Sequence, residues 1–294
     1  MGINISSQVR VVWQGNMILG EGPTYSVSEN AIYWVDIKQP TLYRYDLSSG
    51  QTRSYAMPDY IGWVVARAAG GLIAGFRHGV AHLSLEPLRI DYIAQIETDR
   101  PNYRLNDAKA HPNGSIYFGT MDNDEQESDG RLYRLFPDGQ VMQLDSGYRV
   151  TNGPGFSRDG RRMYTPDSAR AVVYCFDVDD NGNLTGKREF IRFAKGEGYP
   201  DGMTVDADDH LWIAHWGGAC VKRFTPTGEV ERVIPLPAPN ITSCAFAGKN
   251  FDRLFVTSAT KGLSAQQRAE YPLAGSLFEV DTGCVGVAPA LFAG

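Results

Sequence analysis

The chain has 294 residues, with 28 Lys and Arg against 34 Asp and Glu, and so a net charge of −6 at neutral pH. Hydrophobic residues make up 43% and charged residues 21%, which permits a sizeable core and excludes bulk disorder. No run rich in Lys and Arg is present, so neither nucleic acid nor a membrane surface is expected as a partner.

Pairs of short apolar strands, separated by turns, recur along the chain. In chain order, the first members of the predicted pairs are residues 31–36, 72–76, 115–119, 162–165, 210–214 and 253–257. The second members are residues 42–46, 80–83, 131–135, 172–176, 220–224 and 276–280. The first members begin 41, 43, 47, 48 and 43 residues apart. A step of about 40–50 residues is the length of one four-stranded propeller blade.

The repeat predicts an all-β fold, a six-bladed β-propeller with four-stranded antiparallel blades, in one domain over residues 1–294. One such sheet cannot bury both of its faces, whereas sheets packed around an axis cover one another. Residues 9–13 form a spare strand, and we expect it to pair with the C-terminal strands and lock the ring. A pair of β-sandwiches is the alternative, but it does not explain the fixed step.

Four polar segments each precede a unit by about ten residues, and they therefore occupy one repeated position: residues 19–23, 103–109, 150–154 and 199–203. We expect loops at this position to meet at one mouth of the central channel.

Three residues of these segments, Glu21, Asn152 and Asp201, offer two carboxylates and an amide oxygen from three blades. Such an oxygen-only set suits a divalent cation. The alternative is that Glu-Gly-Pro, Asn-Gly-Pro and Pro-Asp-Gly are ordinary turns. The sequence contains neither an H-E-x-x-H motif nor a G-x-S-x-G motif, which argues against a zinc protease or a serine esterase.

The ordered set of motifs resembles the gluconolactonase/regucalcin family, also called senescence-marker proteins, which are six-bladed propellers that hydrolyse sugar lactones. The resemblance covers nearly the whole chain. It includes Gly-Glu-Gly-Pro at residues 20–23, Arg-Leu-Asn-Asp at 104–107, Thr-Asn-Gly-Pro at 151–154 and Pro-Asp-Gly-Met at 200–203. Val-Asp-Ile-Lys-Gln at residues 35–39 is most similar to bacterial sugar-acid lactonases.

The resemblance implies one divalent metal in the channel mouth, held by Glu21, Asn152 and Asp201. Ca²⁺, Mg²⁺, Mn²⁺, Zn²⁺ and Fe²⁺ all accept such oxygen ligands, so the identity of the metal stays open.

Substrate contacts are implied for Arg104 and Asn106. A further family contact, a Glu shortly after a Gly-Thr-Met segment, aligns with Asp124 in a differently built acidic insert, and Glu125 beside it is the alternative. The expected partner is a small-molecule sugar lactone.

The resulting hypothesis is metal-assisted hydrolysis of an aldono-1,4- or 1,5-lactone to the aldonic acid, with Asp201 removing the proton from the attacking water. Asp167 is a second candidate for this base. Other interpretations are a promiscuous esterase or phosphotriesterase, and a non-catalytic divalent-ion-binding or interaction propeller. The particular lactone and the oligomeric state stay open.

Three features favour a cytoplasmic location. No apolar stretch reaches the roughly 18 residues of a membrane span. Residues 1–10 have neither a basic nor an apolar region, so no signal peptide is expected. The cysteines lack C-x-x-C spacing and are typical of reduced thiols: Cys175, Cys220, Cys244 and Cys284.

Overall fold

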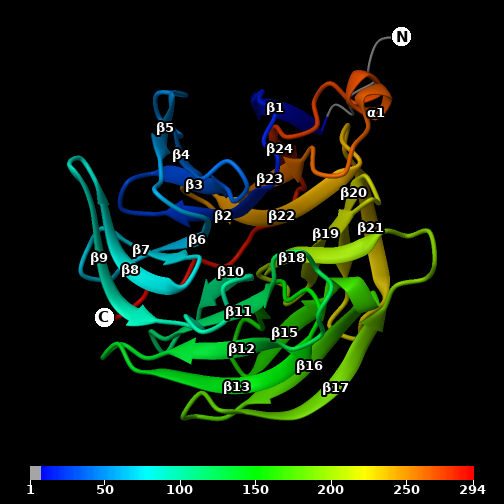
Figure 1. Cartoon of the computed structure of the whole chain (residues 1–294). Helices are drawn as coiled ribbons and strands as arrows, with labels where there is room; N and C mark the ends of the chain where they lie inside the picture. The colour runs from blue at the N-terminus through cyan, green and yellow to red at the C-terminus, as the bar shows by residue number, and fades with distance from the viewer. Residues whose placement is uncertain (1–7) are drawn as a thin grey trace.

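The computed structural model describes residues 8–294, and its strands form antiparallel sheets around a common centre (Figure 1). In most sheets the first strand lies near the centre and the last strand lies at the rim (Figure 1). The prediction that there is no signal peptide was made from residues 1–10, and residues 1–7 of that segment lie outside the described residues. Within residues 8–294, no helix combines the length and the apolar character needed to cross a membrane.

Four of the sheets have four strands each, paired in chain order. The first contains β2 (Gly20–Ser26), β3 (Ala31–Asp36), β4 (Thr41–Asp46) and β5 (Thr52–Ala56). The second contains β6 (Ile61–Ala66), β7 (Leu72–Phe76), β8 (Gly79–Leu85) and β9 (Leu88–Gln95). The third contains β10 (Tyr103–Ala110), β11 (Ile116–Asp122), β12 (Gly130–Leu135) and β13 (Val141–Tyr148). The fourth contains β14 (Gly155–Phe156), β15 (Arg162–Asp167), β16 (Val172–Val178) and β17 (Leu184–Arg192), with the 3₁₀ turn η1 (Ser168–Arg170).

The remaining strands form an eight-stranded sheet that consists of two groups. One group contains β18 (Tyr199–Val205), β19 (Leu211–Trp216), β20 (Cys220–Phe224) and β21 (Val230–Pro235). The other contains β22 (Asn240–Ala247), β23 (Arg253–Ala259), β24 (Leu277–Asp281) and β1 (Val9–Trp13). A single residue pair, Trp216 with Asn240, joins the two groups. The short helix α1 (Ala265–Glu270) follows β23.

The prediction of an all-β fold is confirmed, and the predicted strand pairs fall on the second and third strands of the groups. The second strands were easiest to identify because they are buried on both faces: every residue of β3, β7 and β11 is buried. Neighbouring groups pack through such faces, with Trp34, Trp63 and Trp212 almost fully buried between them.

The prediction for residues 9–13 is also confirmed, since β1 pairs antiparallel with β24 and places Val9 opposite Val280. The last group therefore takes its outermost strand from the start of the chain. This pairing satisfies the β24 edge, which would otherwise expose unpaired backbone groups.

The polar segments ahead of the units were predicted as loops, and for most of them this is wrong, because they lie in the innermost strands. Gly and Pro made these segments resemble turns. An edge strand tolerates Pro, however, because one side of its backbone needs no partner. Five innermost strands also carry one extra residue relative to their neighbours. These bulges lie between Glu21 and Thr24, Ile61 and Trp63, Leu105 and Ala108, Pro200 and Met203, and Ile241 and Ser243.

The C-terminal segment is built into the ring far from β24. The Phe292 backbone donates to the Ala66 carbonyl at 3.0 Å, and its carbonyl accepts from the Ala68 N–H at 2.8 Å. The Phe292 ring is fully buried in a cluster that includes Val65 and Ile116, whereas its neighbour Leu291 is 40% exposed.

We therefore predict that Phe292→Ala lowers the free energy of unfolding by about 3–5 kcal/mol, because it empties a well-packed site. Leu291→Ala is the matched control and should change it by less than about 0.5 kcal/mol. Urea unfolding of both variants measures the difference. Equal effects of the two substitutions would show that the segment does not anchor the fold.

Candidate metal and substrate site

A cavity of about 370 Å³ lies at one end of the innermost strands. Five of the six predicted site residues line it: Glu21, Arg104, Asn106, Asn152 and Asp201. The sixth, Asp124, is not among the lining residues. The polar or aromatic lining residues that complete the cavity include Glu125, Arg149, Ser168, Tyr199, Trp216 and Lys261.

The backbone bulges explain how these side chains gather. Asn106 lies in the bulge of β10 and Asp201 in the bulge of β18, while Glu21 directly precedes the bulge of β2. A bulge bends its strand and redirects the side chains beside it. Asn152 lies at the equivalent place, between the Thr151 bridge to Asp167 and strand β14.

Two strand-end aspartates hold the segments that lead into the site. Asp36 accepts backbone hydrogen bonds from Ile18 at 2.9 Å and Leu19 at 3.1 Å, just before Glu21. These bonds fix the chain that delivers the Glu21 side chain to the cavity.

Asp167 performs the same task ahead of Asn152. It accepts from the backbone of Arg149 at 3.1 Å and of Val150 at 3.2 Å, and it pairs with Arg170 at 2.9 Å. Its carboxylate is fully buried and does not line the cavity. The suggestion that Asp167 acts as the base is therefore corrected, because its carboxylate oxygens already accept hydrogen bonds from the backbone.

A directional chain of hydrogen bonds fixes the orientation of the Asn152 amide. Arg104 donates to Asn106 Oδ1 at 2.5 Å, Asn106 Nδ2 donates to Asn152 Oδ1 at 2.8 Å, and Asn152 Nδ2 donates to Ser168 Oγ at 2.9 Å. Asn106 Nδ2 also donates to the Thr151 carbonyl. The Asn152 oxygen thus faces Asn106 and keeps one lone pair for a ligand.

Glu21 and Asp201 are buried acids, each only 4% exposed. Within the described residues, Asp201 Oδ1 has no hydrogen-bond partner. Burial raises the pKa of Asp201 well above its usual range, and the charge of Glu21 adds to the effect. Burial and the charge of Asp107 likewise raise the pKa of Glu21. Buried carboxylates without a compensating cation are costly when ionised.

These residues fit a divalent cation. Two carboxylates and an oriented amide oxygen form a hard-oxygen donor set, and Asp201 Oδ1 is an orphaned buried acceptor. In residues 8–294, no three His, Cys, Asp or Glu side chains form a possible metal cluster. The candidate set has only two acids, since its third member is an amide.

Arg104 brings a buried positive charge to the same cavity. It is 2% exposed, its Nε lacks a partner, and no ion pair involves it among the described residues. Burial lowers the pKa of this guanidinium. Its remaining donor capacity suits an oxygen of a ligand.

The acidic insert delivers Glu125 rather than Asp124 to the cavity. Asp122 accepts backbone hydrogen bonds from Gln126 at 2.8 Å and from Glu127 at 3.2 Å, which turns the chain after β11. Asp124 is exposed and accepts from an Asn102 amide. Glu125, in a left-handed backbone conformation with φ of 60°, lines the cavity and forms an ion pair with Lys261.

Two cavity residues, Arg149 and Lys261, are absent from the sequence-based prediction. Arg149 directly precedes the segment 150–154, so its place in the repeat could have identified it. Lys261 follows β23 and lies outside the repeated position, so nothing in the pattern indicated it.

Comparison with known proteins identifies the relatives of this chain. Residues 19–260 match the family described as SMP-30/Gluconolactonase/LRE-like region. The chain belongs to this family. The resemblance that the motifs indicated is thereby confirmed, and the relatives span nearly its whole length.

Members of this family include proteins with different names. The regucalcin of Danio rerio is 34% identical over 294 residues, which cover 98% of this chain and 99% of that protein. A pentonolactonase of Haloferax volcanii is 33% identical over 275 residues, which cover 91% and 92% of the two chains. The structure of a calcium-binding protein, regucalcin, from Agrobacterium tumefaciens matches with a TM-score of 0.93 and 28% identity, over 96% of both chains.

The raised pKa of Glu21 predicts how pH affects the metal-free protein. Above the ordinary pKa of 4.5, the unfolded chain releases a proton that the folded chain still holds. The contribution of Glu21 to stability is therefore greatest below this pH and falls as pH rises toward the folded-state pKa. The melting temperature of chelated protein should fall between about pH 5 and pH 8.

Glu21→Gln removes this titration and is expected to make the profile of the chelated protein less steep, with the contribution of Asp201 remaining. A saturating divalent cation should flatten the profile of the unsubstituted protein, because the ionised acids then bind it. Thermal unfolding across pH tests both expectations. Identical profiles for the unsubstituted protein and the E21Q variant, both chelated, would contradict the assignment.

Proposed function

We propose that the protein hydrolyses sugar lactones, converting an aldono-1,4- or 1,5-lactone to the aldonic acid, with one divalent cation. The observation that carries the proposal is the convergence of two buried acids and an oriented amide oxygen beside a buried guanidinium. Glu21, Asn152 and Asp201 would hold the cation. The pentonolactonase name of one relative supports this reaction.

The ring that carries the site is, in this proposal, one domain with six blades. The same bulge recurs in the innermost strands, and the eight-stranded sheet has two groups joined by one residue pair. A cytoplasmic location stays a prediction from the sequence.

When bound, a divalent cation polarises an ester carbonyl and lowers the pKa of water. Asp201 is the proposed proton acceptor for the attacking water in addition to its role as a ligand, because a carboxylate has two oxygens and its Oδ1 has no partner among the described residues. Proton removal by a placed carboxylate raises the nucleophilicity of water at the moment of attack. Burial keeps competing water from this oxygen.

Arg104 and Asn106 would orient the substrate. The unpartnered Nε of Arg104 can donate to a lactone oxygen, and the guanidinium would also stabilise the carboxylate of the product. Asn106 uses both amide protons on Thr151 and Asn152, so only its oxygen remains for a sugar hydroxyl. Glu125 is the acid of the insert proposed to accept from another hydroxyl.

A non-catalytic divalent-ion-binding protein is the second candidate, favoured by the calcium-binding description of the Agrobacterium tumefaciens relative. A promiscuous esterase or phosphotriesterase would use the same site. Acid release from a panel of sugar lactones, carboxylic esters and phosphotriesters separates these functions. In this assay, each metal is added in turn to protein from which a chelator has removed bound metal. Metal binding without acceleration of any lactone would overturn the proposed hydrolysis.

We predict that Asn152→Ala weakens metal binding and lactone hydrolysis together while the fold persists, because the oxygen is lost from a site on rigid strands. The matched control is Asn181→Ala, which alters an exposed amide in a hairpin turn. Calorimetric titration with metal, acid release and circular dichroism provide the three measurements. Undiminished metal affinity of Asn152→Ala would refute its role as a ligand.

We further predict that Asp201→Asn lowers kcat by about 10²–10⁴-fold even at saturating metal, because an amide oxygen can bind a cation but cannot take a proton. Retained kcat at saturating metal would assign the base to another group. Metal titration of the same variant separates the loss of a ligand charge from the loss of the base.

A further inference from the structure

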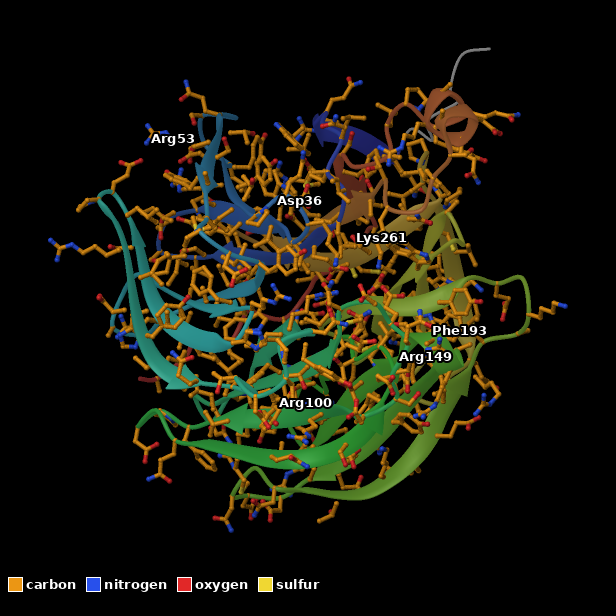
Figure 2. The ribbon with its side chains drawn as sticks, in the orientation of Figure 1. Asp36, Arg53, Arg100, Arg149, Phe193 and Lys261 are labelled. Atoms are coloured by element: carbon orange, nitrogen blue, oxygen red, sulfur yellow. The ribbon has the colours of Figure 1, made fainter. Side chains whose placement is uncertain are left out.

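Positive side chains gather around the cavity although the whole chain has a net charge of −6. Arg104, Arg149 and Lys261 line the cavity, and Lys38 lies near enough to Arg104 and Lys261 to feel their charges. Burial and the positive charges of Arg104 and Lys261 lower the pKa of Lys38 to about 8, which reflects this crowding. Figure 2 labels Arg149 and Lys261, which come from segments far apart in the chain.

The partners of these cations differ. Lys261 forms an ion pair with Glu125, and Lys38 donates to the Asn123 side-chain oxygen at 2.6 Å. Half-buried Arg149 donates from Nε to the Glu125 carbonyl at 2.8 Å. Among residues 8–294, no ion pair involves Arg149, and its terminal nitrogens make no hydrogen bond.

With a divalent cation and the product of hydrolysis bound, most charges of the site can be matched in pairs of opposite sign. A divalent cation would balance Glu21 and Asp201, and Lys261 balances Glu125. The nearby buried acid Asp107 has Lys109 as its positive neighbour. Arg104 would face the single carboxylate that hydrolysis of a neutral lactone creates. Within the described part of the chain, Arg149 then remains without a negative partner, whereas the charges of Glu125 and Asp124 act on Lys38. An aldonolactone with an uncharged chain leaves this excess positive charge unused.

We propose that the substrate is a sugar lactone with a second anionic group at the far end of its carbon chain, and that Arg149 binds that group. This inference rests on the proposed lactone hydrolysis. A carboxylate, a sulfonate and a phosphate share the required chemistry, since each presents oxygens to the two terminal nitrogens of a guanidinium. Lys38 adds long-range attraction for such an anion.

The competing explanation is that Arg149 serves only to anchor the acidic insert through the Glu125 carbonyl. In that case the loss of the Arg149 side chain would disturb the cavity and lower the activity on every lactone to the same extent. A pair of substrates that differ only in the remote group distinguishes these roles, because only the anion-binding role changes the preference between them.

The test compares the 1,4-lactone of glucaric acid, which has a remote carboxylate, with the 1,4-lactone of gluconic acid, which has a hydroxymethyl group there. We expect kcat/KM to favour the glucaric lactone by about ten-fold or more, and Arg149→Gln to abolish that preference. The control Arg89→Gln removes an exposed charge from β9 and should retain it. Lactones of 6-phosphogluconic and 6-sulfogluconic acid show which anion is preferred.

Equilibrium binding keeps the inference separate from the reaction. In calorimetry with metal-loaded protein, the dianion glucarate should bind about ten-fold more tightly than gluconate, and Arg149→Gln should remove the difference. The inference would be overturned if the protein preferred neither the glucaric lactone in hydrolysis nor glucarate in binding. It would also be overturned if Arg149→Gln weakened both members of each pair equally. If no lactone is hydrolysed but glucarate still binds through Arg149, the proposed function fails while the anion site stands.

Discussion

The site depends on the cost of keeping two carboxylates, Glu21 and Asp201, away from water without an equal positive charge. Burial alone disfavours their ionised forms, and their proximity adds repulsion. The buried cation in the lining, Arg104, donates to Asn106 and not to either acid. This imbalance is the physical reason for proposing that the cavity binds a divalent ion.

The sequence predicts much of this fold because the buried middle strands of each group carry an apolar pattern at a nearly constant step. The innermost strands were predicted less well. Gly22 and Pro23 signal a turn in any local interpretation, yet they lie in the bulge of β2. Whether such a segment turns or remains in a strand depends on β3 beside it, which is a contact that periodicity does not contain.

The candidate site shows the same division. Glu21, Asn152 and Asp201 could be predicted to share a cavity because they recur at one position of the repeat. Their roles as ligands stay a proposal. Asp124 and Glu125 could not be distinguished, since the turn imposed by Asp122 decides which of the two points inward. Lys261 belongs to no repeat, and only the closed ring brings it to Glu125.

The pairing of β1 with β24 also has a consequence for biosynthesis. The partner of Val9 is Val280, so β1 stays unpaired until the chain has been synthesised through residue 280. Until then the ring has an open seam. The ring therefore cannot close before β24 is made, and during elongation the nascent polypeptide must keep an apolar strand out of incorrect associations.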